Sequence, residues 1–207
     1  MNVGVGFMRD YIVNSSRNLI KKDNPDYSEE RLEILEYGLT GLYIFISKSI
    51  VIFSIAYFLG ILKELIIFML IYNLIRLVSF GMHATSSTAC LVASAFSFLS
   101  ATYLCKYFII PIGFKVIFGI ISIIYVYLHS PADTEKRPII SQKRRFIYKS
   151  LSTFIAIVMV ICSIIIDDIF ISNSFSISLL IQCFMISPFA YKLTGQKYDN
   201  YKDYLND

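Results

Sequence analysis

A histidine and a cysteine lie close together in a polar interruption of an otherwise apolar sequence. His83 precedes Cys90 by seven residues, in a stretch of small and polar residues that begins near Gly81. An imidazole can take the proton of a thiol, and the thiolate that results is a strong nucleophile. Polar groups inside a membrane-like sequence are costly and point to function. The pair therefore indicates a cysteine nucleophile and a histidine base working at a bilayer surface.

This chemistry requires a break in the helix that carries the two residues. On an uninterrupted helix, residues seven apart are separated by about 10.5 Å along the axis, which is too far for proton transfer. We predict a break at Gly81 and a new helix that starts near Ser87, with Cys90 in its first turn. The helix dipole and backbone amides would there favour the thiolate and hold an oxyanion. The alternative is a turn histidine and a cysteine that only packs.

The composition is that of an integral membrane protein. Of 207 residues, 56% are hydrophobic and only 16% are charged, which is far from ordinary globular usage. The cysteines occur singly, without the paired spacing of a zinc site, and no glycine loop for phosphate is present, so neither metal nor cofactor is expected. The net charge of +4 is modest, and nucleic acid is not an expected partner. No cleavable signal peptide is evident at the start.

The apolar pattern predicts an all-α membrane protein with about six membrane helices and a broken or re-entrant helix near His83 and Cys90. Residues 1–37 resemble amphipathic helices on the cytoplasmic face, with Ser28 as a helix N-cap, although a solvated helix pair fits equally well. Residues 38–191 form the predicted membrane domain, and residues 192–207 a cytoplasmic tail. The predicted apolar segments are residues 38–60, 65–80, 86–105, 108–129, 149–166 and 169–191. The second is short for a complete span.

The distribution of basic residues predicts the orientation in the plasma membrane. Lys and Arg gather before residue 38, between residues 136 and 149, and in the tail, whereas only Lys63, Lys106 and Lys115 fall on the other side. By the positive-inside rule, both termini are cytoplasmic. Six crossings then place His83, Cys90 and the loop that begins at Pro131 on the cytoplasmic side.

Three further charged residues are candidates for the site. Arg76 could bind a substrate carboxylate or orient the turn before His83, or it could be an arginine that reaches the interface from a helix end. Lys48 lies within an apolar segment and could meet an acidic peptide, or it could reach the interface by a shifted helix boundary. Asp133 could orient His83, but a rigid turn between two prolines is favoured. His129 is the alternative candidate to His83 for the catalytic base.

Two separated motifs resemble those of a known family. Two regions of the chain are similar to the two signature regions of the accessory gene regulator B (AgrB) family. The first contains Arg76, Gly81, His83, Ala84 and Cys90, and the second runs from Ser130 to Ile139. The motif sequences are RLVSFGMHATSSTAC at residues 76–90 and SPADTEKRPI at residues 130–139. The layout of the whole chain is also similar, although Phe80 stands where the family often has a glycine.

The resemblance implies a membrane cysteine endopeptidase of Gram-positive quorum sensing. Its substrate would be a short AgrD-like propeptide, with Cys90 as nucleophile and His83 as base. The acyl-enzyme would be captured by a cysteine or serine of the peptide to give a thiolactone or lactone. The alternatives are a small peptide exporter without proteolytic activity, with Lys48, Asn73 and Arg76 along its path, or a membrane scaffold. Small residues such as Ala93 and Ala101 also allow a homodimer.

Overall fold

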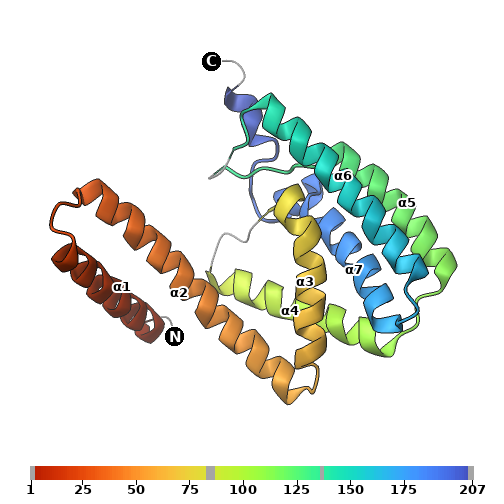
Figure 1. The fold of residues 1–207 in the computed structure, drawn as a ribbon, viewed down its shortest axis with the longest axis horizontal. Coiled ribbons are helices and arrows are strands. Elements are labelled where there is room, and N and C mark those ends of the chain that lie inside the picture. Colours follow the sequence, from red (N-terminus) through yellow and green to blue (C-terminus); the bar gives the residue numbers. More distant parts are fainter. Residues whose placement is uncertain (1–2, 83–86, 136–137, 205–207) are drawn as a thin grey trace. The chain divides into compact units, whose positions relative to one another are not determined.

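The computed structural model describes residues 3–82, 87–135 and 138–204, and these are folded almost entirely as helices (Figure 1). No strand is present in these ranges, and Phe80 and Ala132 form an isolated β-bridge. The α-helices are α1 (Val3–Asp23), α2 (Glu29–Phe58), α3 (Leu62–Ser79), α4 (Ser87–Tyr107), α5 (Ile112–His129), α6 (Gln142–Ile165), α7 (Ile169–Met185) and α8 (Pro188–Leu193), and a 3₁₀ helix spans Asn200–Tyr204. The predicted all-α class is confirmed.

The chain divides into two compact units, Met1–Ile55 and Ala56–Asp207. In the first unit, ion pairs connect α1 to the start of α2. Arg17 contacts Glu29 at 2.8 Å and Glu36 at 3.6 Å, and Lys21 also contacts Glu29. The Ser28 hydroxyl accepts a hydrogen bond from the Arg31 amide at 3.3 Å, so the predicted N-cap is confirmed. Because α2 runs unbroken through residue 38, the predicted domain division there stays a prediction.

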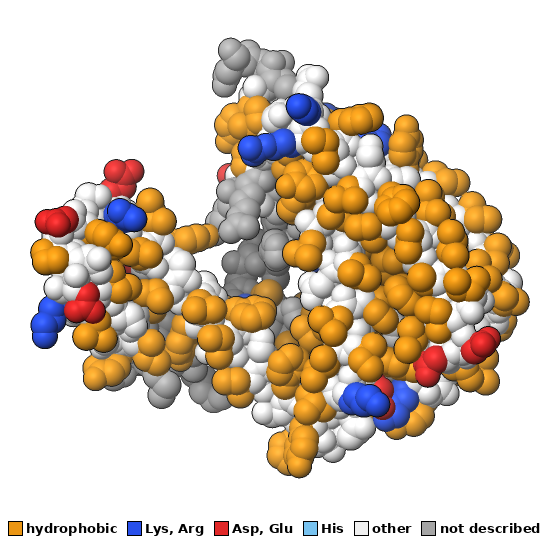
Figure 2. Space-filling model, in the orientation of Figure 1, with side chains coloured by type: hydrophobic (Ala, Val, Ile, Leu, Met, Phe, Trp, Pro, Cys, Tyr) orange, Lys and Arg blue, Asp and Glu red, His pale blue; other side chains and the backbone are white. Residues whose placement is uncertain are grey.

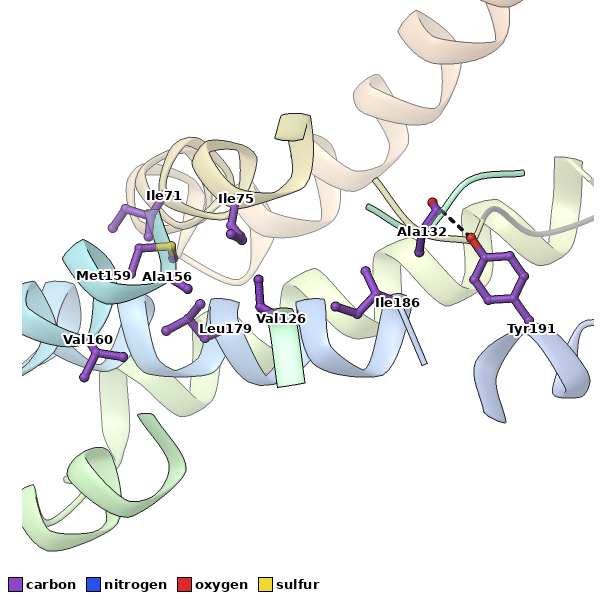
Figure 3. Packing of buried hydrophobic residues seen from close by; sticks show 10 residues of the cluster. All are labelled: Ile71, Ile75, Val126, Ala132, Ala156, Met159, Val160, Leu179, Ile186 and Tyr191. Carbon is purple, nitrogen blue, oxygen red and sulfur yellow. Dashed lines mark hydrogen bonds between the residues drawn. The ribbon is translucent and has the colours of Figure 1, made fainter. Parts of the chain in front are cut away.

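The second unit is a helical bundle in which α3, α5 and α6 pack against α7. Its main core contains Ile75 of α3, Val126 of α5, Ala156 of α6 and Leu179 of α7, all fully buried (Figure 3). A second cluster joins Phe68 of α3 to Cys105 of α4. At the far ends of α3 and α4, Lys106 pairs with Glu64 at 2.8 Å. This packing holds α3 and α7 side by side and so positions the end of α3 relative to the end of α7.

Polar side chains fix the starts of the later helices. The Ser141 hydroxyl accepts from the Arg144 amide at the start of α6. The Asp168 carboxylate accepts from the Ile171 amide at 2.8 Å at the start of α7, and Ser187 serves α8 in the same way. Each cap satisfies an amide that has no acceptor within its own helix. The caps therefore define short connections between α6, α7 and α8.

Within the described ranges, four helices are long and apolar enough to cross a membrane, and the protein is a membrane protein on this evidence. They are α2, α4, α5 and α6, while α7 is apolar but shorter. Figure 2 shows hydrophobic side chains gathered over the α5 and α6 side of the second unit, with charged side chains towards its two ends. Each of the first five predicted segments falls on one helix, from α2 to α6, whereas the sixth, residues 169–191, covers α7 and most of α8. Crossing of the bilayer by α3 and α7, and hence the number six, stays a prediction.

The predicted break between the second and third apolar segments is confirmed. Helix α3 ends at Ser79, and α4 begins at Ser87, the residue predicted from the sequence. Phe80 and Gly81 both have positive φ angles, 57° and 116°, which no α-helix accommodates. Whether the intervening chain re-enters the bilayer stays a prediction, since residues 83–86 lie outside the described ranges.

Candidate functional site

Arg76 closes the end of α3 by binding the backbone that follows it. Its guanidinium donates hydrogen bonds to the carbonyl oxygens of Phe80, of Gly81 at 3.2 Å and of Met82 at 2.8 Å. Because three carbonyls point towards one guanidinium, Arg76 sets the direction in which the chain leaves α3. Hydrogen bonds from a charged donor are stronger than those between neutral groups. Of the predicted roles for Arg76, this geometry fits the orienting one.

Gly81 sits where no side chain would fit. With φ at 116°, a Cβ atom on this residue would lie 2.7 Å from the carbonyl oxygen of Met185 and closer still to the guanidinium of Arg76. Glycine alone adopts this conformation readily and leaves this space empty. The predicted need for glycine at the break is therefore explained by both the backbone angle and the close approach of two neighbours.

The first motif is bound to the second motif by backbone hydrogen bonds. The Gly81 amide donates to the Ala132 carbonyl at 2.9 Å, and the Ala132 amide donates to the Ser79 carbonyl at 3.0 Å. The Met82 amide donates to the carbonyl of Met185, at the end of α7, at 3.0 Å. We call residues 79–82 and 131–133 together the two-motif junction. It brings together segments that are about fifty residues apart in the sequence.

Asp133 is a buried structural carboxylate of this junction. Its oxygens accept hydrogen bonds from the amides of Ile139 at 3.2 Å and of Asn200 and Tyr201 at 3.1 Å each. The guanidinium of Arg145 lies 3.4 Å from the same carboxylate. These contacts tie the loop to the start of α6 and to the tail. They fit the rigid turn favoured from the sequence, while a role towards His83 stays a prediction.

Tyr191 and Gln182 also hold the junction, and the sequence analysis did not single them out. The buried Tyr191 hydroxyl donates to the carbonyls of Ala132 at 3.2 Å and Asp133 at 2.7 Å (Figure 3 draws the contact with Ala132). The buried Gln182 side chain donates to the Ser79 hydroxyl and to the Phe80 carbonyl, the latter at 2.8 Å. An amide side chain within an apolar segment was the available signal for Gln182.

Cys90 is the fourth residue of α4, as expected from the predicted helix start. Its side chain is partly exposed and its thiol is free, with the Ser94 hydroxyl 4.0 Å from the sulfur. A helix N-terminus offers backbone amides and the positive end of the helix dipole, which suit both a thiolate and an oxyanion. His83 lies outside the described residues, so its pairing with Cys90 stays a prediction.

The other candidate residues, Lys48 and His129, do not belong to the two-motif junction. Lys48 is a half-buried residue of α2 in the first unit, so its relation to the junction is not defined. His129, the competing imidazole, ends α5, and its Nδ1 atom lies 3.0 Å from the Tyr198 hydroxyl. Its ring also packs on Tyr125, with the ring centroids 4.3 Å apart. Among the described residues, no group of acidic, histidine or cysteine side chains could hold a metal ion.

The fold and the junction define a polytopic helical membrane protein with a free cysteine at the start of a helix. A family model described as "Accessory gene regulator B" matches residues 13–186. The chain belongs to this AgrB family, which confirms the resemblance of its two motifs. No solved structure matches the chain.

Three relatives illustrate the extent of the similarity. An AgrB-like protein of Clostridium acetobutylicum is 30% identical over 185 residues, which cover 88% of each chain. An AgrB-like protein of Listeria monocytogenes is 29% identical over 188 residues, 90% of this chain and 91% of the relative. Accessory gene regulator protein B of Staphylococcus aureus is 29% identical over 175 residues, 82% of this chain and 89% of the relative. Family membership supports a role in the accessory gene regulator quorum-sensing system.

Proposed function

We propose that this protein is a membrane cysteine endopeptidase that cleaves the carboxy-terminal part of a short AgrD-like propeptide. The observation that carries the proposal is the position of Cys90 in the first turn of α4, directly after the break at Gly81. Membership of the AgrB family supports the same role. The chain contributes the nucleophile, and by the family resemblance His83 contributes the base.

The reaction proceeds by two acyl transfers. His83 takes the thiol proton of Cys90, and the thiolate attacks the scissile carbonyl of the propeptide to give a tetrahedral oxyanion. Amides at the start of α4 stabilise that oxyanion. The C–N bond then breaks, the carboxy-terminal fragment leaves as an amine after it receives the proton from His83, and a thioester to Cys90 remains.

A cysteine or serine of the bound peptide then attacks the thioester. This nucleophile loses its proton to His83, the bond to Cys90 breaks, and the peptide becomes a thiolactone or lactone while Cys90 regains a proton. Exchange of one thioester for another has a free energy close to zero, so water must be kept from the thioester until capture. A site at the membrane interface meets this requirement. We place the site and both termini on the cytoplasmic side, as the distribution of Lys and Arg favours.

The rigidity of the two-motif junction supports this proposal. Arg76, Gln182 and Tyr191 fix five carbonyl groups of residues 80–82 and 132–133. Catalytic groups need their positions held within a fraction of an ångström, and a loop of this kind needs such support. In sequence, His83 directly follows Met82, the last residue of the first segment of the junction.

The test is co-expression with a tagged AgrD-like propeptide, followed by mass spectrometry of the products. Cys90→Ala should abolish cleavage. Cys162→Ala is the matched control, because Cys162 is also a free, partly exposed cysteine of an apolar helix, and it should cleave normally. Normal cleavage by Cys90→Ala would contradict the proposal. Cleavage that continues while secretion of the product stops would favour the exporter instead.

A further inference from the structure

A cavity of about 420 Å³ lies beside the two-motif junction and shares Pro131 with it, but most of its lining comes from other residues. The end of α5 contributes Leu128 and His129, and α6 contributes Arg145, Phe146 and Lys149. Tyr198, Asp199 and Tyr201 of the tail close the other side. None of these residues belongs to the proposed catalytic pair, and the reaction described above makes no use of the space.

The cavity carries an excess of positive charge. Asp199, the one acidic residue among the described residues that line it, is already paired with Lys202 at 2.6 Å. Arg145 is shared between Asp133 and the face of the Tyr201 ring, whose centroid lies 3.3 Å from the guanidinium carbon. The Lys149 ammonium group lies 4.2 Å from the Tyr127 ring centroid, and within the described residues it has no carboxylate partner at salt-bridge distance. Lys149 is therefore a positively charged lining residue without a negatively charged partner among the described residues.

Hydrogen-bond donors accompany this charge. The Tyr198 hydroxyl and the His129 ring lie together on the cavity wall, 3.0 Å apart. Burial raises the pKa of Tyr198 well above its ordinary value, so the phenol keeps its proton and adds no negative charge. Lys149, Arg145 and a phenol are together suited to the oxygens of an anion such as a phosphate.

Two exposed apolar side chains line the cavity, at the ends of two helices that can cross a membrane. Leu128 is 62% exposed and Phe146 is 71% exposed, and both line the cavity. His129 is the last residue of α5, and Arg145 and Lys149 fall in the first two turns of α6. The ends of spanning helices lie near the depth of lipid headgroups, so the basic lining residues and the exposed apolar side chains match the two parts of a phospholipid.

We propose that this cavity binds one anionic phospholipid, with its phosphate near Lys149 and Arg145 and its acyl chains along Leu128 and Phe146. An acidic segment of a peptide would match the charge but would leave the exposed Leu128 and Phe146 without an apolar partner, so the lipid is the favoured occupant. Because the cavity wall includes Pro131 and Arg145, a bound lipid would also brace the loop that contains Asp133. The proposal does not depend on the proteolytic function.

The experiment uses the full-length protein in dodecyl maltoside micelles. Short-chain phosphatidylglycerol is titrated while the thermal unfolding midpoint is followed, and native mass spectrometry counts the bound lipids. Parallel titrations use phosphatidylcholine, inorganic phosphate and a tetraglutamate peptide. We expect one saturable phosphatidylglycerol site, with an unfolding midpoint that rises with lipid concentration, and no comparable effect of the other three compounds. Equal effects of phosphatidylcholine, or a stronger effect of phosphate or peptide, would overturn the proposal.

Matched variants of α6 locate the site. Lys149→Gln should weaken phosphatidylglycerol binding about fivefold, as expected for one basic group at a headgroup, whereas Lys149→Arg should retain it. Lys143→Gln changes an exposed lysine of the same helix that does not line the cavity, and it should bind as the unchanged protein does. Equal losses in Lys143→Gln and Lys149→Gln would show only general attraction to a basic helix end and would overturn the site.

Discussion

The amide of Gly81 donates a hydrogen bond to the carbonyl oxygen of Ala132, 2.9 Å away, and so connects the two sequence motifs of the chain. The two motifs are not adjacent in sequence: the first ends at Cys90, and the second follows α5. Their contact gives the second motif a physical role, which is to support the chain that runs from the end of α3 towards His83.

Gly81→Ala should disrupt the junction. A residue with a side chain at φ 116° is strained, and its Cβ would clash with the Met185 carbonyl and Arg76. We expect a loss of roughly 2 kcal/mol of stability and a loss of cleavage, measured by denaturant unfolding in micelles and by product analysis. Gly113→Ala is the control, since nothing lies within 4 Å of its Cβ position, and it should fold and cleave normally. Equal stability of the two variants would contradict the structural role of Gly81.

Arg76→Met should remove the guanidinium that binds the carbonyls of residues 80–82. A hydrogen bond to a charged group contributes about 1.5–3 kcal/mol, so we expect the loss of all three to cost at least about 2 kcal/mol and to slow cleavage. Arg76→Lys should lose less, because one ammonium group retains part of these contacts. Arg144→Met, at an exposed arginine, serves as the control. Unchanged stability together with weaker peptide binding would instead favour the role of Arg76 in holding a substrate carboxylate.

Gln182→Leu keeps a similar volume but removes the donor to Ser79 and Phe80. The Phe80 carbonyl retains Arg76 as a partner, so the stability loss should be moderate, about 1 kcal/mol. Because the variant loosens the path to His83 without touching the peptide, kcat should fall while KM stays nearly constant. Asn73→Leu, at an exposed amide of α3, should change neither constant. A rise in KM alone would place Gln182 in peptide binding.

Asp133→Asn should release the tail. Three backbone amides and Arg145 point at this carboxylate, and an amide group would present a donor where acceptors are needed. We expect about 3 kcal/mol of destabilisation and faster proteolysis within residues 199–204. Asp203→Asn, at an exposed carboxylate of the same tail, should leave the junction intact. If Asp133→Asn kept a protected tail but shifted the pH profile of cleavage, Asp133 would act on His83.

Much of this arrangement followed from local sequence signals. The break at Gly81, the start of α4 at Ser87 and the N-cap at Ser28 are all set by residues within one helical turn. Hydropathy likewise indicated the apolar helices. Such features depend on backbone conformation and capping, which short stretches of sequence determine.

The long-range contacts could not be predicted in the same way. Nothing in the pattern around Gly81 indicates that its amide meets Ala132, or that Tyr191 reaches the same loop from α8. These pairings depend on how α3, α6 and α7 pack, and one sequence specifies periodicity but not partners. The same reason explains why Asp133 had two open roles, since the tail residues that bind it are sixty-seven and sixty-eight positions away.

The most direct test of the account is to trap the acyl-enzyme on Cys90. The purified protein is incubated with a propeptide whose ring-forming cysteine is replaced by alanine, quenched in acid and analysed by intact-protein and peptide-level mass spectrometry. We predict an added mass equal to the amino-terminal fragment, located on Cys90, removed by hydroxylamine and absent from Cys90→Ala. Cleavage without this adduct, or an adduct that persists in Cys90→Ala, would contradict the account.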